Sequence, residues 1–190
     1  ERGIGGAGLG LLPTNCLMVG DSANEAAAAR AAGCVGVVLL RHGYNHGVDE
    51  AALESAVKLL AKADTVHVVG MRRAFPVAFY MVYVFEKMQV PAMLHDAVGK
   101  LDHRYALRPG DAILAITFAP YSEETLTLAQ DARDRGLPVV AMTDQLTSPL
   151  ARQSDAVLTV PEVDFGAFRS LSATIAMALS LAVAVGTARG

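Results

Sequence analysis

The chain has 190 residues, a length that fits one domain comfortably and two only tightly. Hydrophobic residues make up 53% and charged residues 18%, which argues against disorder and implies a large core or an apolar subunit interface. The formal net charge is −3 and no basic stripe is present, so we expect no direct nucleic-acid binding by this chain.

Cysteine usage and apolar segments favour a cytoplasmic protein. Cys16 and Cys34 belong to no CxxC pair, and we interpret them as buried thiols in a reducing compartment. The longest apolar stretch, 173–185, is shorter than the ~18–20 residues that a membrane span needs, and no secretory signal pattern begins the sequence. No HxxxH or cysteine pair supports a metal site. We therefore expect no membrane span, no metal and no cofactor.

The first 47 residues predict a small unit of their own. A glycine-rich run is followed by a strand, an alanine-rich helix and a second strand, at 3–10, 16–19, 24–32 and 35–40. One such βαβ fragment cannot bury both faces of its strands, so we expect it to dock on something else. We place the domain boundary near Gly47, with the larger domain at 48–190.

Strands and helices alternate through the rest of the chain. Short apolar runs bounded by turn residues predict strands over 65–70, 90–94, 111–117, 138–143 and 156–160. Helical spacing and capping signals predict helices over 48–63, 76–88, 122–135, 148–153 and 167–188. This alternation implies right-handed crossovers, and hence an α/β domain: a doubly wound, three-layer αβα sandwich with a five-stranded parallel sheet.

Ligands of such sheets bind outside the carboxyl ends of the strands. The loops expected at that edge are 70–76, 94–105, 117–122 and 143–149. The last predicted helix, 167–188, is apolar nearly all round and must be covered on every side. Since one sheet covers only one side of it, we predict a homodimer in which this helix contributes to the interface.

Three short motifs follow one another in the first unit: 17–25 (LMVGDSANE), 31–34 (AAGC) and 41–47 (RHGYNHG). Together they resemble the C-terminal segment of haloacid-dehalogenase-type phosphatases, most closely phosphoglycolate phosphatase. The resemblance implies that Asp21 and Glu25 match the acidic pair that holds Mg²⁺ in that family. The family's nucleophilic aspartate motif and lysine motif are absent from the sequence, and phosphoryl-enzyme chemistry needs a nucleophile. We interpret this unit as a relic or fusion fragment without phosphatase activity.

Four motifs in the larger unit lie at predicted strand ends: 68–76 (VVGMRRAFP), 108–111 (RPGD), 116–125 (ITFAPYSEET) and 143–151 (TDQLTSPLA). They resemble the SIS (sugar isomerase) domain over residues 50–190. The run 72–76 is similar to the effector domains of RpiR-type transcription regulators rather than to the isomerases. The resemblance implies a domain that binds carbohydrate derivatives, in particular sugar phosphates, and that regulates transcription through a helix-turn-helix domain outside this chain.

Two loops depart from the family pattern. Arg72 and Arg73 replace a small Gly/Ser cluster in the first loop. The second loop reads Ser-x-Ser-Gly-x-Thr in the family, and here it keeps hydroxyls at Thr117 and Ser122 but loses the middle hydroxyl and the glycine at 119–120. A smaller hydroxyl cradle with two added guanidinium groups still suits an anion.

The candidate ligand-binding residues carry a cation, a hydroxyl or an aromatic ring; they are Arg72, Arg73, Thr117, Tyr121, Ser122 and Arg169. For most of them an ordinary structural role stays open. The arginines could pair with acidic neighbours at the surface, Ser122 could simply cap a helix, and Tyr121 could simply cover its loop.

The leading hypothesis is a non-catalytic, dimeric sensor of a phosphorylated sugar or a similar small anion. The first alternative is an aldose–ketose phosphosugar isomerase of the same fold, which needs a base such as His95 or His103. The second is a decayed fusion product that binds no ligand.

Overall fold

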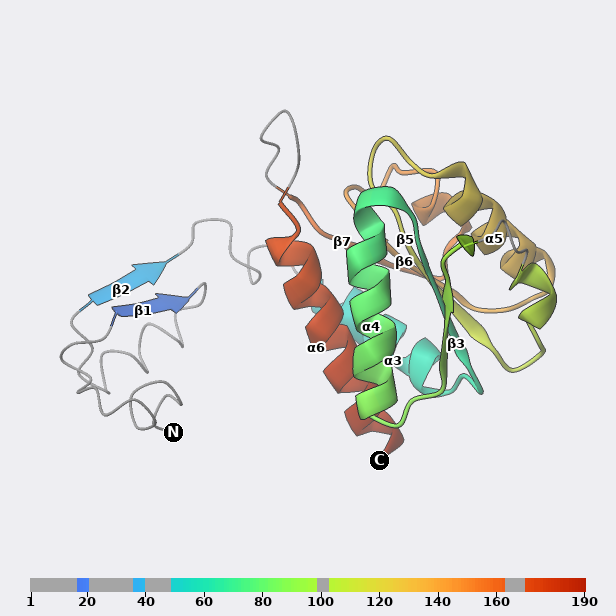
Figure 1. Cartoon of the computed structure of the whole chain (residues 1–190), viewed down its shortest axis with the longest axis horizontal. Helices are drawn as coiled ribbons and strands as arrows, with labels where there is room; N and C mark the ends of the chain where they lie inside the picture. Colours follow the sequence, from blue (N-terminus) through green and yellow to red (C-terminus); the bar gives the residue numbers. More distant parts are fainter. Residues whose placement is uncertain (1–16, 21–35, 40–48, 99–102, 163–169) are drawn as a thin grey trace. The chain divides into compact units, whose positions relative to one another are not determined.

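The computed structural model describes residues 17–20, 36–39, 49–98, 103–162 and 170–190 (Figure 1). The chain divides into two compact units, Glu1–Gly47 and Val48–Gly190, and each is described by itself. In the first unit, β1 (Leu17–Gly20) and β2 (Gly36–Leu39) pair in parallel. The predicted helix at 24–32 and the candidate pair Asp21 and Glu25 lie outside the described residues.

The second unit contains a five-stranded sheet. Its strands are β3 (Val66–Gly70), β4 (Ala92–His95), β5 (Ala112–Ile116), β6 (Val139–Thr143) and β7 (Ala156–Thr159). All pairings are parallel and the order is β4-β3-β5-β6-β7, which confirms the predicted sheet. Every residue of β3, β5 and β6 is buried, as expected for strands covered on both faces.

Helices cover both faces of this sheet. They are α3 (Glu50–Ala61), α4 (Phe75–Lys87), α5 (Glu123–Asp134) and α6 (Ser172–Arg189). On one face α3 packs against β5, β6 and β7, α4 packs against β3 and β4, and α6 packs on α3 and α4. On the other face α5 packs against β5 and β6 (Figure 1). The arrangement is the three-layer αβα sandwich that the alternation of elements predicts.

Local sequence signals explain where most helices begin. The Asp49 carboxylate accepts from the backbone N–H groups of Ala51 and Ala52, and so caps α3. Pro76 lies in the first turn of α4, where its missing N–H costs nothing. The helix predicted over 148–153 is wrong in type and length, because only Ala151–Gln153 is helical and it forms a single 3₁₀ turn.

The helix α6 is long and apolar enough to cross a membrane, judged by length and composition alone. In the fold, Met177, Leu181 and Val185 on one side of it are buried. This side packs against α3 and α4, so the packing supports the interpretation of α6 as a core helix. Ile175 and Val183 on the other side are exposed.

The sheet has a topological switch point between β3 and β5. From β3 the chain crosses to β4 on one side, and β5 is followed by β6 and β7 on the other side. The loops that leave the carboxyl ends of β3 and β5 therefore diverge, and a doubly wound sheet leaves room for a ligand at such a place.

Candidate functional site

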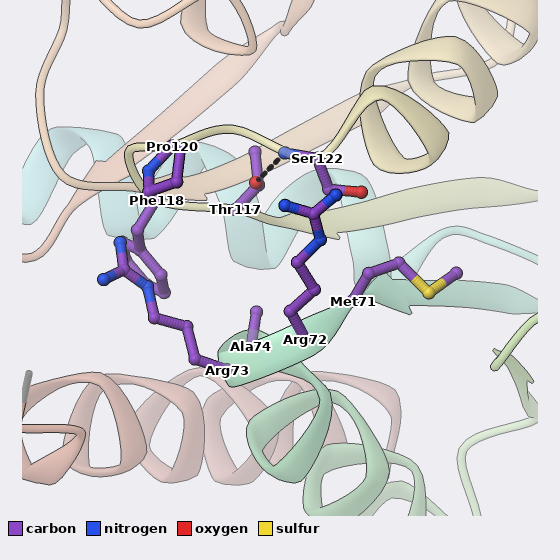
Figure 2. A pocket seen from close by; sticks show the side chains of 8 residues that line it. All are labelled: Met71, Arg72, Arg73, Ala74, Thr117, Phe118, Pro120 and Ser122. Carbon is purple, nitrogen blue, oxygen red and sulfur yellow. Dashed lines mark hydrogen bonds between the residues drawn. The ribbon is translucent and has the colours of Figure 1, made fainter. Parts of the chain in front are cut away.

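A cavity of about 150 Å³ lies at this switch point. Two segments form it, one after β3 and one after β5 (Figure 2). The lining residues are Met71, Arg72, Arg73, Ala74, Thr117, Phe118, Pro120 and Ser122. The fold thus brings together four of the six predicted ligand-binding residues: Arg72, Arg73, Thr117 and Ser122.

The first segment turns sharply because of Gly70 and Arg72. A Cβ atom at Gly70 would lie 3.0 Å from the Cβ of Ala78 and 3.1 Å from the carbonyl oxygen of Ala74, so glycine is needed for α4 to approach. Arg72 has a φ of 55°, a left-handed conformation that costs roughly 1 kcal/mol for a residue with a side chain. This turn leaves the Arg72 side chain exposed, and it extends toward Thr117 and Ser122 (Figure 2).

Arg73 connects the two segments of the cavity. Its guanidinium donates to the carbonyl oxygen of Ala119 and lies 5.6 Å from the centre of the Phe118 ring. The side chain is half-buried. Neighbouring arginines therefore have different surroundings: Arg73 is held against the second loop, whereas Arg72 is exposed beside the two hydroxyls.

The two hydroxyl residues are buried and bonded to each other. The Ser122 backbone N–H donates to the Thr117 Oγ1 at 3.0 Å (Figure 2). The Ser122 Oγ accepts from the backbone N–H of Thr125 at 3.3 Å, and it donates to the Glu124 carboxylate at 2.6 Å. Ser122 is thus both the N-cap of α5 and part of the cavity wall.

The hydroxyl of Ser122 also changes the acidity of Glu124. Its hydrogen bond to the carboxylate is the largest of the effects that lower the pKa of Glu124, and the backbone N–H of Glu124 acts in the same direction. Desolvation opposes this lowering of the pKa, and the positive charge of Arg72 adds a still smaller lowering effect. Glu124 is therefore held in its ionised form next to the cavity wall.

Tyr121 does not line this cavity. Its hydroxyl donates to the Asp144 Oδ1 at 3.0 Å and accepts from the Gln145 Nε2 at 3.0 Å. The other carboxylate oxygen of Asp144 accepts from the Ala119 backbone N–H at 3.1 Å. Asp144 thus holds the second loop in place without lining the cavity itself. Sequence reasoning made no prediction for Asp144, although it belongs to the motif 143–151. The remaining candidate, Arg169, lies outside the described residues.

A second cluster of polar side chains is buried in the sheet; it consists of His67, His95 and Asp111. The His67 Nε2 lies 3.0 Å from the Asp111 Oδ2, and the His67 Nδ1 lies 2.9 Å from the His95 Nε2. The Arg108 backbone N–H also donates to the Asp111 Oδ2, at 2.7 Å. With Asp111 ionised, His67 donates from Nε2 to this carboxylate, and its Nδ1 accepts the Nε2–H of His95.

Sequence reasoning treated His95 as a loop histidine and did not single out His67. The pairing of β3 with β4 brings them together, because His95 pairs with Val69, which lies two residues after His67 and so on the same face of the sheet. Within the part of the chain that the structure describes, no group of three His, Cys, Asp or Glu side chains is arranged to hold a metal ion.

Comparison with known proteins agrees with the fold. The family model of the SIS domain matches residues 59–185. A solved structure of the sugar isomerase domain of an RpiR transcription factor from Sphaerobacter thermophilus is similar, with a TM-score of 0.68 and 26% identity over 75% of this chain and 80% of that one.

Two curated relatives are similar in sequence. The HTH-type transcriptional regulator HexR of Escherichia coli is 30% identical over 121 residues, which are 62% of this chain and 41% of the regulator. The glutamine–fructose-6-phosphate aminotransferase of Bradyrhizobium diazoefficiens is 29% identical over 116 residues, 59% of this chain and 19% of the enzyme. The chain therefore spans less than half the length of either relative. On the match of the family model over most of its length, the chain belongs to the SIS domain family.

Proposed function

We propose that residues 48–190 are the sugar-phosphate-sensing domain of an RpiR-type transcription regulator. The observation that carries the proposal is the cavity at the switch point, where an exposed arginine faces two buried hydroxyls. Arginine and hydroxyl donors are the groups that bind phosphoryl oxygens. The likeness to HexR and to the RpiR sugar isomerase domain supports the regulator family, and the fructose 6-phosphate in the name of the aminotransferase relative supports the ligand class.

The lining of the cavity favours sensing over catalysis. An aldose–ketose isomerase needs a general base within reach of the sugar carbons. Among the described residues that line the cavity, none has a carboxylate, imidazole or amine side chain. The isomerase stays the alternative, because His95 ends the neighbouring strand β4 and is ordered by His67 and Asp111.

The proposed assembly is a homodimer in the cytoplasm. Large hydrophobic side chains are exposed on α4 and α6, which pack against each other. They are Phe79, Tyr80 and Tyr83 on α4 and Ile175 and Val183 on α6. An apolar patch of this kind is typical of a subunit interface. DNA binding would belong to another domain of the regulator, and the phosphatase-like nature of residues 1–47 stays a prediction.

Thermal-shift measurements test the proposal. The purified chain is melted with a panel of sugar phosphates, the same sugars without phosphate, and inorganic phosphate. A ligand that binds only the native state raises the melting temperature with its concentration, so we expect a rise with at least one sugar phosphate and none with its unphosphorylated sugar. Equal shifts for a sugar with and without phosphate would contradict the proposal. Turnover of a sugar phosphate to its isomer would favour the alternative.

A further inference from the structure

The Ser122 hydroxyl, on the wall of the cavity, already donates a hydrogen bond to an anionic side chain. It has a single proton, and it donates this proton to the Glu124 Oε2 over 2.6 Å. The lone pair of the same oxygen accepts the Thr125 N–H of the helix cap. A phosphoryl group that uses the Ser122 hydroxyl as a donor must therefore take the place of the Glu124 carboxylate.

Arg72 is the second group that an incoming anion could meet beside Ser122. Its charge acts on Glu124, and its side chain extends toward Ser122 on the cavity side (Figure 2). Arg73 is held by the Ala119 carbonyl and the Phe118 ring instead. The carboxylate of Glu124 thus holds the Ser122 hydroxyl, a group that would otherwise be offered, together with Arg72, to an incoming anion.

We propose that Glu124 is a built-in competitor of the ligand: its carboxylate engages the Ser122 hydroxyl until a phosphoryl group displaces it. This inference rests on the proposed function, and it adds a residue that sets affinity and selectivity. Glu124 is exposed, so its side chain is free to turn into solvent when it is displaced. Ser122 keeps its helix cap throughout, because the Thr125 N–H bonds to a lone pair and not to the exchanged proton.

Because a ligand must displace the Glu124 carboxylate, the site favours ligands that carry more than one negative charge. A ligand carboxylate carries one negative charge, so when it replaces the Glu124 carboxylate the site gains no stronger contact. A phosphoryl group carries −1.5 to −2 charges near pH 7 and three acceptor oxygens, so it makes stronger contacts with Arg72 and Ser122 than the carboxylate it replaces. The site therefore discriminates phosphorylated sugars from sugar acids.

Removal of the competitor is expected to increase affinity. We would titrate inorganic phosphate into the ¹⁵N-labelled chain at constant ionic strength and follow the amide signals of Ser122 and Thr125. For Glu124→Gln we expect a dissociation constant about three- to tenfold lower than that of the wild type, since the carboxylate is exposed and its bond is partly screened. Acetate should bind Glu124→Gln but bind the wild type much more weakly.

Glu123 provides the matched control. It carries the same charge in the same first turn of α5, yet its side chain makes no hydrogen bond to Ser122 in the described structure. Glu123→Gln should change phosphate affinity by no more than about twofold, the general effect of one charge on a helix terminus. Arg72→Ala combined with Glu124→Gln should lose most of the gain.

The outcomes separate the two proposals. If the wild type binds phosphate or a sugar phosphate but Glu124→Gln binds no better than Glu123→Gln, the competitor role of Glu124 is overturned and the proposed function stands. If neither the wild type nor Glu124→Gln binds phosphate or any sugar phosphate of the panel, the proposed function is overturned, and the role of Glu124 with it.

Discussion

At the scale of single residues, neighbouring arginines in one loop have separate roles. Arg72 is exposed in a left-handed conformation and extends toward the hydroxyls, whereas Arg73 joins the two loops through Ala119 and Phe118. The sequence suggests an anion clamp made of both. In the structure Arg73 is held by contacts within the cavity wall, so we propose Arg72 as the residue that meets the ligand.

Substitution of Arg72 should therefore lower affinity without lowering stability. Arg72→Ala removes a charge-assisted contact worth roughly 1.5–3 kcal/mol, so sugar-phosphate affinity should fall about tenfold or more in calorimetry. Arg72→Lys should restore only part of it, because lysine lacks the planar fork. Thr117→Val should cost about 1 kcal/mol of binding free energy, since it removes one neutral hydroxyl. An Arg72→Ala variant with wild-type affinity would show that Arg72 is only a surface residue.

The buried cluster of His67, His95 and Asp111 should be important for stability. Asp111→Ala leaves the Nε2–H of His67 and the Arg108 N–H without their acceptor, in the interior of the sheet. The free energy of unfolding should fall by roughly 3 kcal/mol, measured by urea denaturation. Asp96→Ala is a suitable control, because Asp96 lies in a loop and, among the described residues, its carboxylate accepts from the exposed backbone N–H of Val98. A loss below about 1 kcal/mol in Asp111→Ala would mean that water replaces the carboxylate.

At the scale of elements, the cavity depends on how closely α4 approaches the end of β3. Gly70 is the last residue of β3, and α4 begins at Phe75 after the 3₁₀ turn Arg72–Ala74. The short connection and the small residues Ala74 and Ala78 bring the helix against the strand. The packing of α4 against the end of β3 therefore determines the position of the Arg72 backbone, and with it the direction of its side chain.

Gly70→Ala tests this contact. The new methyl group would meet Ala78 at 3.0 Å and a backbone carbonyl at 3.1 Å, so the helix must shift or the site must be strained. Overpacking of this kind lowers the free energy of unfolding by about 1–3 kcal/mol, and sugar-phosphate affinity should fall with it as the first loop moves. Wild-type stability by thermal and urea denaturation would contradict the close approach.

At the scale of the whole molecule, the exposed hydrophobic residues of α4 and α6 are the feature that one copy of the domain does not explain. Phe79, Tyr80 and Tyr83 lie at i, i+1 and i+4 on α4, and Val183 on α6 is 50% exposed. These two helices pack side by side, so a second copy could cover both at once. The proposed dimer explains why a helix that is apolar nearly all round is stable in water.

Val183→Asp should dissociate this dimer. Light scattering should show a dimer for the wild type and a monomer for the variant at micromolar concentration, because an unpaired charge is costly in an apolar interface. Leu146→Asp is the control, since Leu146 is 70% exposed in the loop between β6 and β7 and belongs to neither α4 nor α6. A wild-type monomer, or a Val183→Asp dimer, would contradict the predicted interface.

Features that depend on residues close together in the chain could be predicted from the sequence. Continuous apolar runs predict buried parallel strands, and Ser122 before an acidic first turn predicts the start of α5. Alternating elements then imply a doubly wound sheet, and so the edge at which a ligand binds. Arg72, Arg73, Thr117 and Ser122 could be placed at this edge in the same way, and all four line the cavity.

The partners of these side chains, in contrast, follow from contacts between distant parts of the chain. The His67–His95 and His67–Asp111 contacts join residues 28 and 44 apart, and Arg73 reaches Ala119 across 46 residues. The order β4-β3-β5 brings all of these together, and local periodicity carries no information about strand order. The different surroundings of Arg72 and Arg73 also depend on the folded backbone. The left-handed conformation of Arg72 turns the chain, so the two neighbouring side chains extend in different directions.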